Sequence, residues 1–266
     1  MNAVVLVAAH KSYRMPADPL YLPVQVGAAG RESIGFQRDD EGENISSLNP
    51  FFCELTAVYW AWKNLSPKES QYIGLAHYRR HFASPSVPAG KDPWERILKF
   101  SDIENDFGKI QAFVPGKRRY YIETLYSHYA HTHEEKQLDE TRKILSEKNP
   151  EMLPVYDRTL RQRWGYMFNM MILSRPLFDA YCEWVFGILF ELRARLGEEG
   201  LSTFDARYYG RVSEILFNVW LNRKLETGEL RPEEIREIPV LHMEKTNWRK
   251  KGSKFLKAKF LGRKYE

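Results

Sequence analysis

Cysteine is scarce in this sequence: 266 residues include only Cys53 and Cys182, and both lie in apolar, helix-like patterns. Two cysteines in such settings indicate reduced, structural thiols rather than a disulfide framework. Long apolar runs are also missing, since none approaches the roughly 20 residues of a membrane span. The apolar segment 3–9 follows Met1 without a basic region or cleavage-site pattern, which indicates a first β-strand rather than a signal peptide. We therefore expect a cytoplasmic protein, free or attached to a membrane surface.

Two common nucleotide-binding motifs are absent as well. The chain has no Gly-x-x-x-x-Gly-Lys-Ser/Thr loop, and no Gly-x-Gly-x-x-Gly follows the first strand, which argues against a P-loop enzyme and an ordinary Rossmann dehydrogenase. His128, His131 and His133 lack the spacing of a zinc site and have no cysteine nearby, so we expect no metal there. His133 stays a candidate acceptor contact at the start of a helix.

The net charge of +5 is distributed unevenly. Residues 245–266 carry nine Lys or Arg and one Glu, so the rest of the chain is mildly acidic. A nucleic-acid-binding domain would spread its cations over a folded face, so we expect no nucleic-acid partner. The tail interleaves lysines with Leu256 and Phe260, one helical turn apart, which favours contact with an anionic membrane surface. The alternative is a disordered, solubilising C-terminus.

Short apolar runs alternate with helical patterns, and a hydrophobic content of 43% suffices for a buried core. The runs cover residues 3–9, 71–76, 110–114 and 170–173. The helices are expected to begin at Asn49 with Pro50, near Thr132, at Ser174 with Pro176, and near Phe204. This alternation predicts an α/β fold with a mostly parallel central sheet, covered by helices on both faces. We expect one domain over residues 1–244 and a separate tail over 245–266.

Ligands of such sheets bind beyond the carboxyl ends of the strands. That rule selects residues 10–18, 77–82 and 115–121, and those around Asn169. The segment His77-Tyr78-Arg79-Arg80-His81 directly follows a buried strand, and its cationic groups can bind a diphosphate by charge-assisted hydrogen bonds. The alternative is a solvated loop with an ordinary salt bridge.

Other segments leave more than one interpretation open. Residues 39–44, which include Asp39, Asp40 and Asn44, can hold Mn²⁺ or Mg²⁺, bind ribose hydroxyls, or form a polar turn, and the turn is favoured when the segment is taken alone. Lys117 and Tyr121 lie in a basic loop that can contact a phosphate or an acceptor.

Glu214 lies two helical turns after Arg207 on nearly the same face. The two side chains can form a plain ion pair. Alternatively, the carboxylate can act on an acceptor hydroxyl or hold a catalytic arginine.

These segments together resemble the bacterial capsular and exopolysaccharide glycosyltransferases whose domain was long catalogued as one of unknown function. The most distinctive stretch is Tyr72-Ile73-Gly74-Leu75-Ala76-His77-Tyr78-Arg79-Arg80. The other matching stretches are Ala9-His10-Lys11, Met15-Pro16, Asp18-Pro19, Gln25-Val26-Gly27-Ala28, Arg38-Asp39-Asp40, Asn44-Ile45-Ser46, Asn49-Pro50, Cys53-Glu54-Leu55-Thr56, Tyr59-Trp60, Trp62-Lys63-Asn64, Tyr120-Tyr121-Ile122-Glu123-Thr124, Asn169-Met170, Phe178, Tyr181-Cys182-Glu183-Trp184, Arg207, Gly210 and Glu214.

The resemblance implies a GT-A-like fold and transfer of a hexose from a nucleotide-diphosphate donor, often UDP-linked, to a growing and possibly lipid-linked surface polysaccharide. His77-Tyr78-Arg79 occupies the position of the usual metal-binding Asp-x-Asp motif, so cations can take over from the metal, with Asp39 and Asp40 as fallback ligands of Mn²⁺ or Mg²⁺. The enzyme is then expected at the inner face of the cytoplasmic membrane.

On this interpretation the candidate residues divide into three groups. The catalytic candidates are Glu214, Arg207 and His77, the donor contacts are His10, Lys11, Asp39, Asp40, Asn44, His77, Arg79 and Arg80, and the acceptor or phosphate contacts are Lys117, Tyr121, His133 and Asn169.

Two positions depart from the family pattern. Ile215 stands where an arginine commonly follows the glutamate, and Met171 stands where an aromatic residue is common. The first departure and the missing Asp-x-Asp motif support an alternative function, a carbohydrate-binding or scaffold protein of polysaccharide assembly that has lost turnover.

Overall fold

The computed structural model describes residues 2–68 and 70–244. The basic tail, with its predicted membrane contact, therefore lies outside the described residues. The strands are β1 (Ala3–Ala9), β2 (Tyr21–Gln25), β3 (Gln37–Arg38), β4 (Tyr72–His77), β5 (Arg80–Phe82), β6 (Ala112–Pro115), β7 (Arg118–Arg119), β8 (Trp164–Gly165), β9 (Met171–Ser174), β10 (Ile235–Ile238) and β11 (Val240–His242). The α-helices are α1 (Asn49–Phe52), α2 (Leu55–Asn64), α3 (Leu125–Thr132), α4 (Lys136–Lys148), α5 (Leu153–Leu160), α6 (Arg175–Leu196) and α7 (Tyr208–Glu226). Short 3-10 turns are η1 (Ser46–Leu48), η2 (Phe100–Asp102), η3 (Glu104–Asp106), η4 (Pro150–Met152), η5 (Asp205–Arg207) and η6 (Pro232–Glu234).

The strands of the described residues form a mixed, mostly parallel sheet with the order β10-β6-β9-β4-β1-β2-β3, and a separate pair, β7-β8. Leu6 of β1 lies opposite Leu22 of β2 and Leu75 of β4, and both pairings are parallel. β9 runs antiparallel to its neighbours β4 and β6. The four predicted strands correspond to β1, β4, β6 and β9 and are confirmed. The direction of β9 was not predicted, because an apolar run does not encode strand direction.

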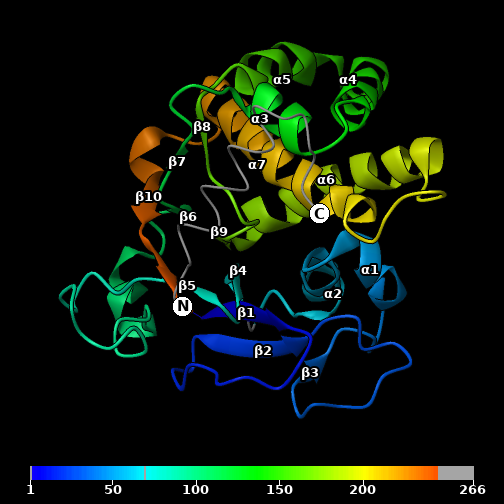
Figure 1. Ribbon diagram of the computed structural model, residues 1–266. Coiled ribbons are helices and arrows are strands. Elements are labelled where there is room, and N and C mark those ends of the chain that lie inside the picture. Colours follow the sequence, from blue (N-terminus) through cyan, green and yellow to red (C-terminus); the bar gives the residue numbers. More distant parts are fainter. Residues whose placement is uncertain (1, 69, 245–266) are drawn as a thin grey trace.

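The two faces of the sheet are covered differently. Leu6 and Ala8 point into the core that the sheet shares with the helices, whereas Val5 and Val7 point to a second core. Helices α3 to α7 gather on one side of the sheet (Figure 1). The second core is closed by residues of the segment 83–111, which contains η2 and η3 in place of α-helices. The prediction of helices on both faces therefore holds for one face.

The helix predictions succeed unequally. α6 begins where expected, after Ser174 and with proline in its first turn. The helix at Asn49 is also present, but Leu48 occupies the N-cap, and the Asn49 side chain donates to the carbonyl of Cys53 at 2.7 Å.

The predicted start near Thr132 is wrong, because Thr132 ends α3 and its hydroxyl donates to the carbonyl of His128 at 2.8 Å. The capping box lies at Thr124 instead, where the threonine and Ser127 bond each other's backbone N–H.

β2 has no counterpart in the prediction. Its five residues include Pro23, and proline argues against a strand in a sequence pattern. Among the described residues, no helix combines the length and apolarity needed to cross a bilayer.

Candidate active site

The predicted ligand-binding segments meet at one edge of the sheet. His77 ends β4 opposite Ala8 of β1, so His10 follows at the same edge. Because β9 is antiparallel to β4, its amino end, next to Asn169, lies there too. β6 is parallel to β4 through β9, so Lys117 also follows a strand that ends at this edge.

A strained turn lies at the centre of this edge. Phe168 (φ 74°) and Asn169 (φ 53°) both have a left-handed backbone, which costs non-glycine residues about 1–3 kcal/mol each. His77 Nε2 donates to the Phe168 carbonyl at 2.5 Å. The Phe168 N–H donates to the carboxylate of Glu214. Backbone strain of this kind persists only where the surroundings fix it, and it is typical of functional sites.

The side chain of Asn169 fixes the other half of the turn. It is buried, and its Nδ2 donates to Glu54 Oε1 at 2.7 Å and to the Gly210 carbonyl at 2.9 Å. Its Oδ1 accepts from Ser213 Oγ at 2.8 Å. Asn169 therefore ties the turn to Glu54, just before α2, and to α7.

Two carboxylates are held at this turn. Phe168 bonds Glu214 and the adjacent Asn169 bonds Glu54, so the turn holds both groups close together. Desolvation and the negative charge of Glu54 raise the pKa of Glu214 to about 7, against the opposing effect of Arg118 and Arg80. Near neutral pH, Glu214 is therefore divided between an ionised form that can accept a proton and a protonated form.

Arg80 completes the surroundings of the carboxylates. Its guanidinium lies 4.5 Å from the centre of the Phe168 ring, and desolvation lowers its pKa although Glu214 and Glu54 oppose this. Its buried Nε donates to no described atom. A charged group with an unused donor is therefore held beside the carboxylate pair.

Cations gather on the adjoining part of the edge. Burial lowers the pKa of His10, and the charges of Lys11, Arg79, Arg31 and Arg207 add to this effect. Together these groups create a strongly positive potential around His10, which suits a ligand with several negative charges.

Tyr78 provides the platform for this cation cluster. Its buried ring lies edge-on to the His10 imidazole at 5.3 Å, under the Arg79 guanidinium at 4.9 Å, and 5.9 Å from Lys11 Nζ. The negative face of an aromatic ring attracts such cations and so keeps them together.

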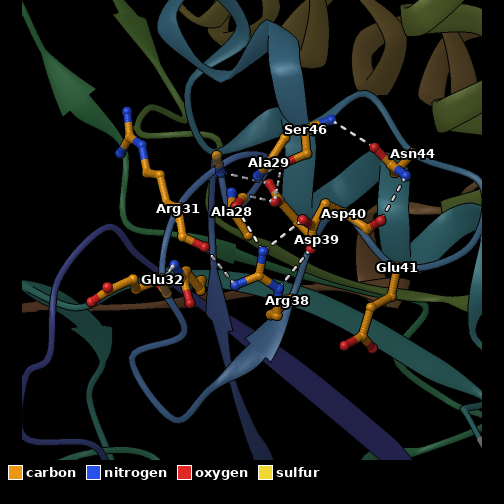
Figure 2. Close-up of polar contacts among 12 residues, drawn as sticks. Ala28, Ala29, Arg31, Glu32, Arg38, Asp39, Asp40, Glu41, Asn44 and Ser46 are labelled. Atoms are coloured by element: carbon orange, nitrogen blue, oxygen red, sulfur yellow. Dashed lines mark hydrogen bonds and ion pairs between the residues drawn. The ribbon is translucent and has the colours of Figure 1, made fainter.

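The acidic segment after β3 has a different role. Asp39 is fully buried and accepts from the backbone N–H of Gly27 at 2.9 Å and of Ala28 at 3.0 Å, and from the hydroxyls of Ser46 and Thr56. Its oxygens are thereby occupied within the protein (Figure 2).

Asp40 and Asn44 also serve this loop. Both oxygens of Asp40 accept from Arg38, at 2.9 and 2.7 Å (Figure 2). The Asn44 side chain donates to the carbonyls of Asp40 and Gly42. The described residues contain no group of three His, Cys, Asp or Glu that could hold a metal ion. These carboxylates shape the turn and do not fit a divalent cation.

Three other candidates lie outside the two clusters. Lys117 Nζ pairs with Glu237 of β10 at 2.7 Å and lies over the Trp164 ring at 4.7 Å. His133 follows the end of α3, not the start of a helix, and contacts Arg211 Nη1 at 2.9 Å. Tyr121 is 78% exposed.

Arg207 and Glu214 do not form the predicted ion pair within one helix. It precedes α7, and its Nε donates to Cys53 Sγ at 3.1 Å. Burial and Glu54 raise the pKa of the Cys53 thiol to about 11 against the effect of Arg207. Arg207 is thereby held toward the cation cluster.

His81 does not join the other residues of the segment 77–81 at the site. It is fully buried between Tyr21 and Trp94.

Residues 4–225 match the family described as a domain of unknown function, DUF4422. The chain belongs to the DUF4422 family. This DUF4422 chain is also similar to a solved apo structure of WbbM, described as a bifunctional glycosyltransferase, with 26% sequence identity and a TM-score of 0.83. The match covers 92% of this chain and 46% of the WbbM chain, so the chain spans about half of that protein. A search of curated proteins gives no match.

Several residues of this DUF4422 site were missed from sequence. Glu54, Phe168 and Ser213 build the turn, and Arg31 joins the cation cluster. Glu54 belongs to one of the family-like stretches, and its place just before a helix is the only signal that could have drawn attention to it. Phe168 gives no signal, since a left-handed phenylalanine is not expected from sequence.

Proposed function

We propose that this DUF4422 domain is a glycosyltransferase with a GT-A-like fold. It moves a sugar from a nucleotide-diphosphate donor, with UDP-linked sugars as the first to test, to a growing surface polysaccharide. The observation that carries the proposal is that a cation cluster and a carboxylate pair adjoin at one sheet edge of a fold similar to WbbM. A diphosphate leaving group and an acceptor hydroxyl need these two kinds of group side by side.

The cation cluster is assigned to the donor. As the bond between the sugar and the diphosphate breaks, negative charge develops on the leaving phosphate, and prearranged cations stabilise it. Lys11, Arg79 and Arg207 supply fixed positive charge near His10, and Arg80 extends it toward the carboxylates. The loop held by Asp39 lies beyond β2 at the same edge and can shape the nucleoside end of the site.

Glu214 is assigned as the general base. The acceptor hydroxyl oxygen bonds to the anomeric carbon while the bond from that carbon to the diphosphate breaks, and the hydroxyl proton passes to the Glu214 carboxylate. A base works best with a pKa near the working pH, and the value of about 7 for Glu214 meets this condition. His77 and Glu54 act as positioning residues, because both hold the turn that orients Glu214.

The residues present do not fit a divalent metal at this edge. By the family resemblance, His77-Tyr78-Arg79 stands at the position of the Asp-x-Asp motif. In the structure, Asp39 is saturated by protein donors and Asp40 is held by Arg38. We therefore assign the neutralisation of the diphosphate to side chains. We assign the acceptor, with any lipid carrier, to the side of the carboxylate pair, where Arg118 lies within electrostatic reach of Glu214.

The test measures the affinity for nucleotides by isothermal titration calorimetry, with and without a chelator. We expect one nucleoside diphosphate to bind equally well in both conditions and binding to be lost in Arg79→Ala. Arg142→Ala, which removes an exposed arginine from α4, is the matched control and should bind normally. Absence of nucleotide binding by the folded protein would contradict the proposal and favour the carbohydrate-binding alternative.

A further inference from the structure

Two large hydrophobic side chains stand exposed among the described residues, and they are neighbours. Tyr121 is 78% exposed and Ile122 is 67% exposed. They follow β7, which pairs with β8 as a small unit separate from the main sheet (Figure 1). Contiguous exposed apolar side chains usually mark an interaction site.

The backbone of this loop is fixed in its outward course. Tyr121 has a left-handed backbone (φ 56°), which a side chain adopts only at a cost. Tyr120 donates its N–H to the carbonyl of Arg163 at 2.8 Å, and Arg163 Nη1 donates to the carbonyl of Tyr121 at 3.3 Å. The pair is therefore held out by hydrogen bonds on both sides.

The base of the loop is also anchored. The buried carboxylate of Glu123 contacts the ring nitrogens of His128 at 2.7 Å and of His131 at 2.9 Å. The Tyr120 ring lies 4.3 Å from the His128 ring. These contacts fix the loop to α3, so Tyr121 and Ile122 form a preset projection.

Positive charge surrounds this projection. Arg119 pairs with Trp164 in the β7-β8 register, which brings Arg163 next to it, and Arg118 precedes it. All three arginines are exposed, and none lies within 4.0 Å of a carboxylate among the described ion pairs. We name this surface the loop tip. It consists of Arg118, Arg119, Tyr121, Ile122 and Arg163.

We infer that the loop tip is a docking surface for an anionic membrane. Arginines near a bilayer are attracted by anionic headgroups, a tyrosine ring prefers the interface, and an isoleucine gains by entering the acyl boundary. A glycan platform would use the tyrosine but has no need of the isoleucine or of three arginines without a carboxylate partner. The charge and the apolar projection together fit the membrane.

The loop tip also adjoins the proposed active site. Arg118 and Tyr120 both lie within electrostatic reach of Glu214. Docking at the tip would present the acceptor side of the site to the bilayer surface. That consequence rests on the proposed function, whereas membrane docking itself does not.

The test is flotation of the full-length chain with vesicles of zwitterionic lipid alone, or mixed with phosphatidylglycerol. To separate the loop tip from the basic tail, the lysines at 250, 251, 254, 257 and 259 are replaced by glutamine in every protein compared. We expect this background to bind the anionic vesicles. Tyr121→Gly with Ile122→Ser should lower the partition coefficient roughly tenfold, because two apolar groups are lost.

The charge contribution is tested separately. Arg119→Gln should also lower partition roughly fivefold, and only on anionic vesicles. The control is Arg142→Gln, which removes an exposed arginine elsewhere and should bind as the background does. Glycine at 121 keeps the left-handed backbone, so misfolding does not explain its effect.

Unchanged vesicle binding by both loop variants, or absence of binding by the background, would overturn the inference. Loss of affinity for soluble oligosaccharide with vesicle binding retained would also overturn it, in favour of a glycan platform. Nucleotide binding by the same variants is measured in parallel. Because the loop tip lies outside the cation cluster, nucleotide binding should persist whether or not docking is lost, so failure of this inference is distinguishable from failure of the proposed function.

Discussion

Replacing Glu214 by glutamine should stabilise the protein at alkaline pH and abolish sugar transfer. Glutamine has nearly the same shape as glutamate, and its side-chain oxygen can still accept from the N–H of Phe168. It lacks the negative charge that desolvation and Glu54 disfavour in the folded protein. It also lacks the basicity that the proposed mechanism requires.

The magnitude follows from the pKa of Glu214, which folding raises from its ordinary value of 4.5 to about 7. Each pKa unit corresponds to about 1.4 kcal/mol, so the ionised side chain costs the folded state about 3 kcal/mol. Between these two pKa values the folded protein binds more protons than the unfolded chain, so stability falls as pH rises through this range. Below 4.5 both states are protonated and the cost is absent.

Urea unfolding of wild type and Glu214→Gln, followed by tryptophan fluorescence, measures this difference. We expect equal stability near pH 4 and a gain of up to about 3 kcal/mol for the variant near pH 8. Glu183→Gln, which removes an exposed carboxylate from α6, should show neither effect. A variant that is no more stable than wild type near pH 8 would refute the argument that Glu214 is held in an unfavourable site.

Three further predictions concern other parts of the molecule. Asp39→Ala should lower the free energy of unfolding, measured by chemical denaturation, by about 3–5 kcal/mol, because four buried donors lose their acceptor. Asp40→Ala should lower it by under about 1 kcal/mol, and equal losses in the two variants would contradict this. Gly74→Ala should destabilise the protein by about 1–3 kcal/mol, because the new Cβ would lie 2.6 Å from a backbone carbonyl oxygen of β9. Gly187→Ala has open space at its Cβ and should stabilise the protein by about 0.5–1 kcal/mol. The same change in melting temperature for both variants would contradict this prediction. Nucleotide binding should be accompanied by proton uptake in weakly acidic buffer, because burial lowers the pKa of His10 and a bound diphosphate raises it again. A binding enthalpy that does not depend on the buffer's ionisation enthalpy would count against this.

The framework of the fold could be predicted because buried strands are continuous apolar runs. The runs at 3–9 and 71–76 became neighbouring parallel strands, so the strand-end rule brought His10 and His77 to one edge. Strand direction could not be predicted, because an apolar run is the same in either direction, and β9 proved antiparallel. The threonine pattern at Thr132 failed because its hydroxyl bonds the preceding turn of α3, so the same spacing has two physical outcomes.

The candidate site was only partly accessible from sequence. His77, Arg79 and Glu214 were selected, but the approach of Glu54 to Glu214 depends on a turn formed far from both in the chain. Asp39 was considered as a metal ligand because clustered carboxylates favour cations. Its burial beneath two backbone N–H groups could be learned only from the fold.

In the proposed mechanism, the carboxylate pair and the cation cluster together transfer a sugar without a metal. The decisive measurement is the rate at which nucleotide is released from a panel of nucleotide sugars, UDP-linked sugars first, in the presence of a chelator. We expect release by the wild type and a loss of at least about a hundredfold in Glu214→Gln with nucleotide binding intact. Release by Glu214→Gln at the wild-type rate, or loss of wild-type activity on chelation, would contradict it.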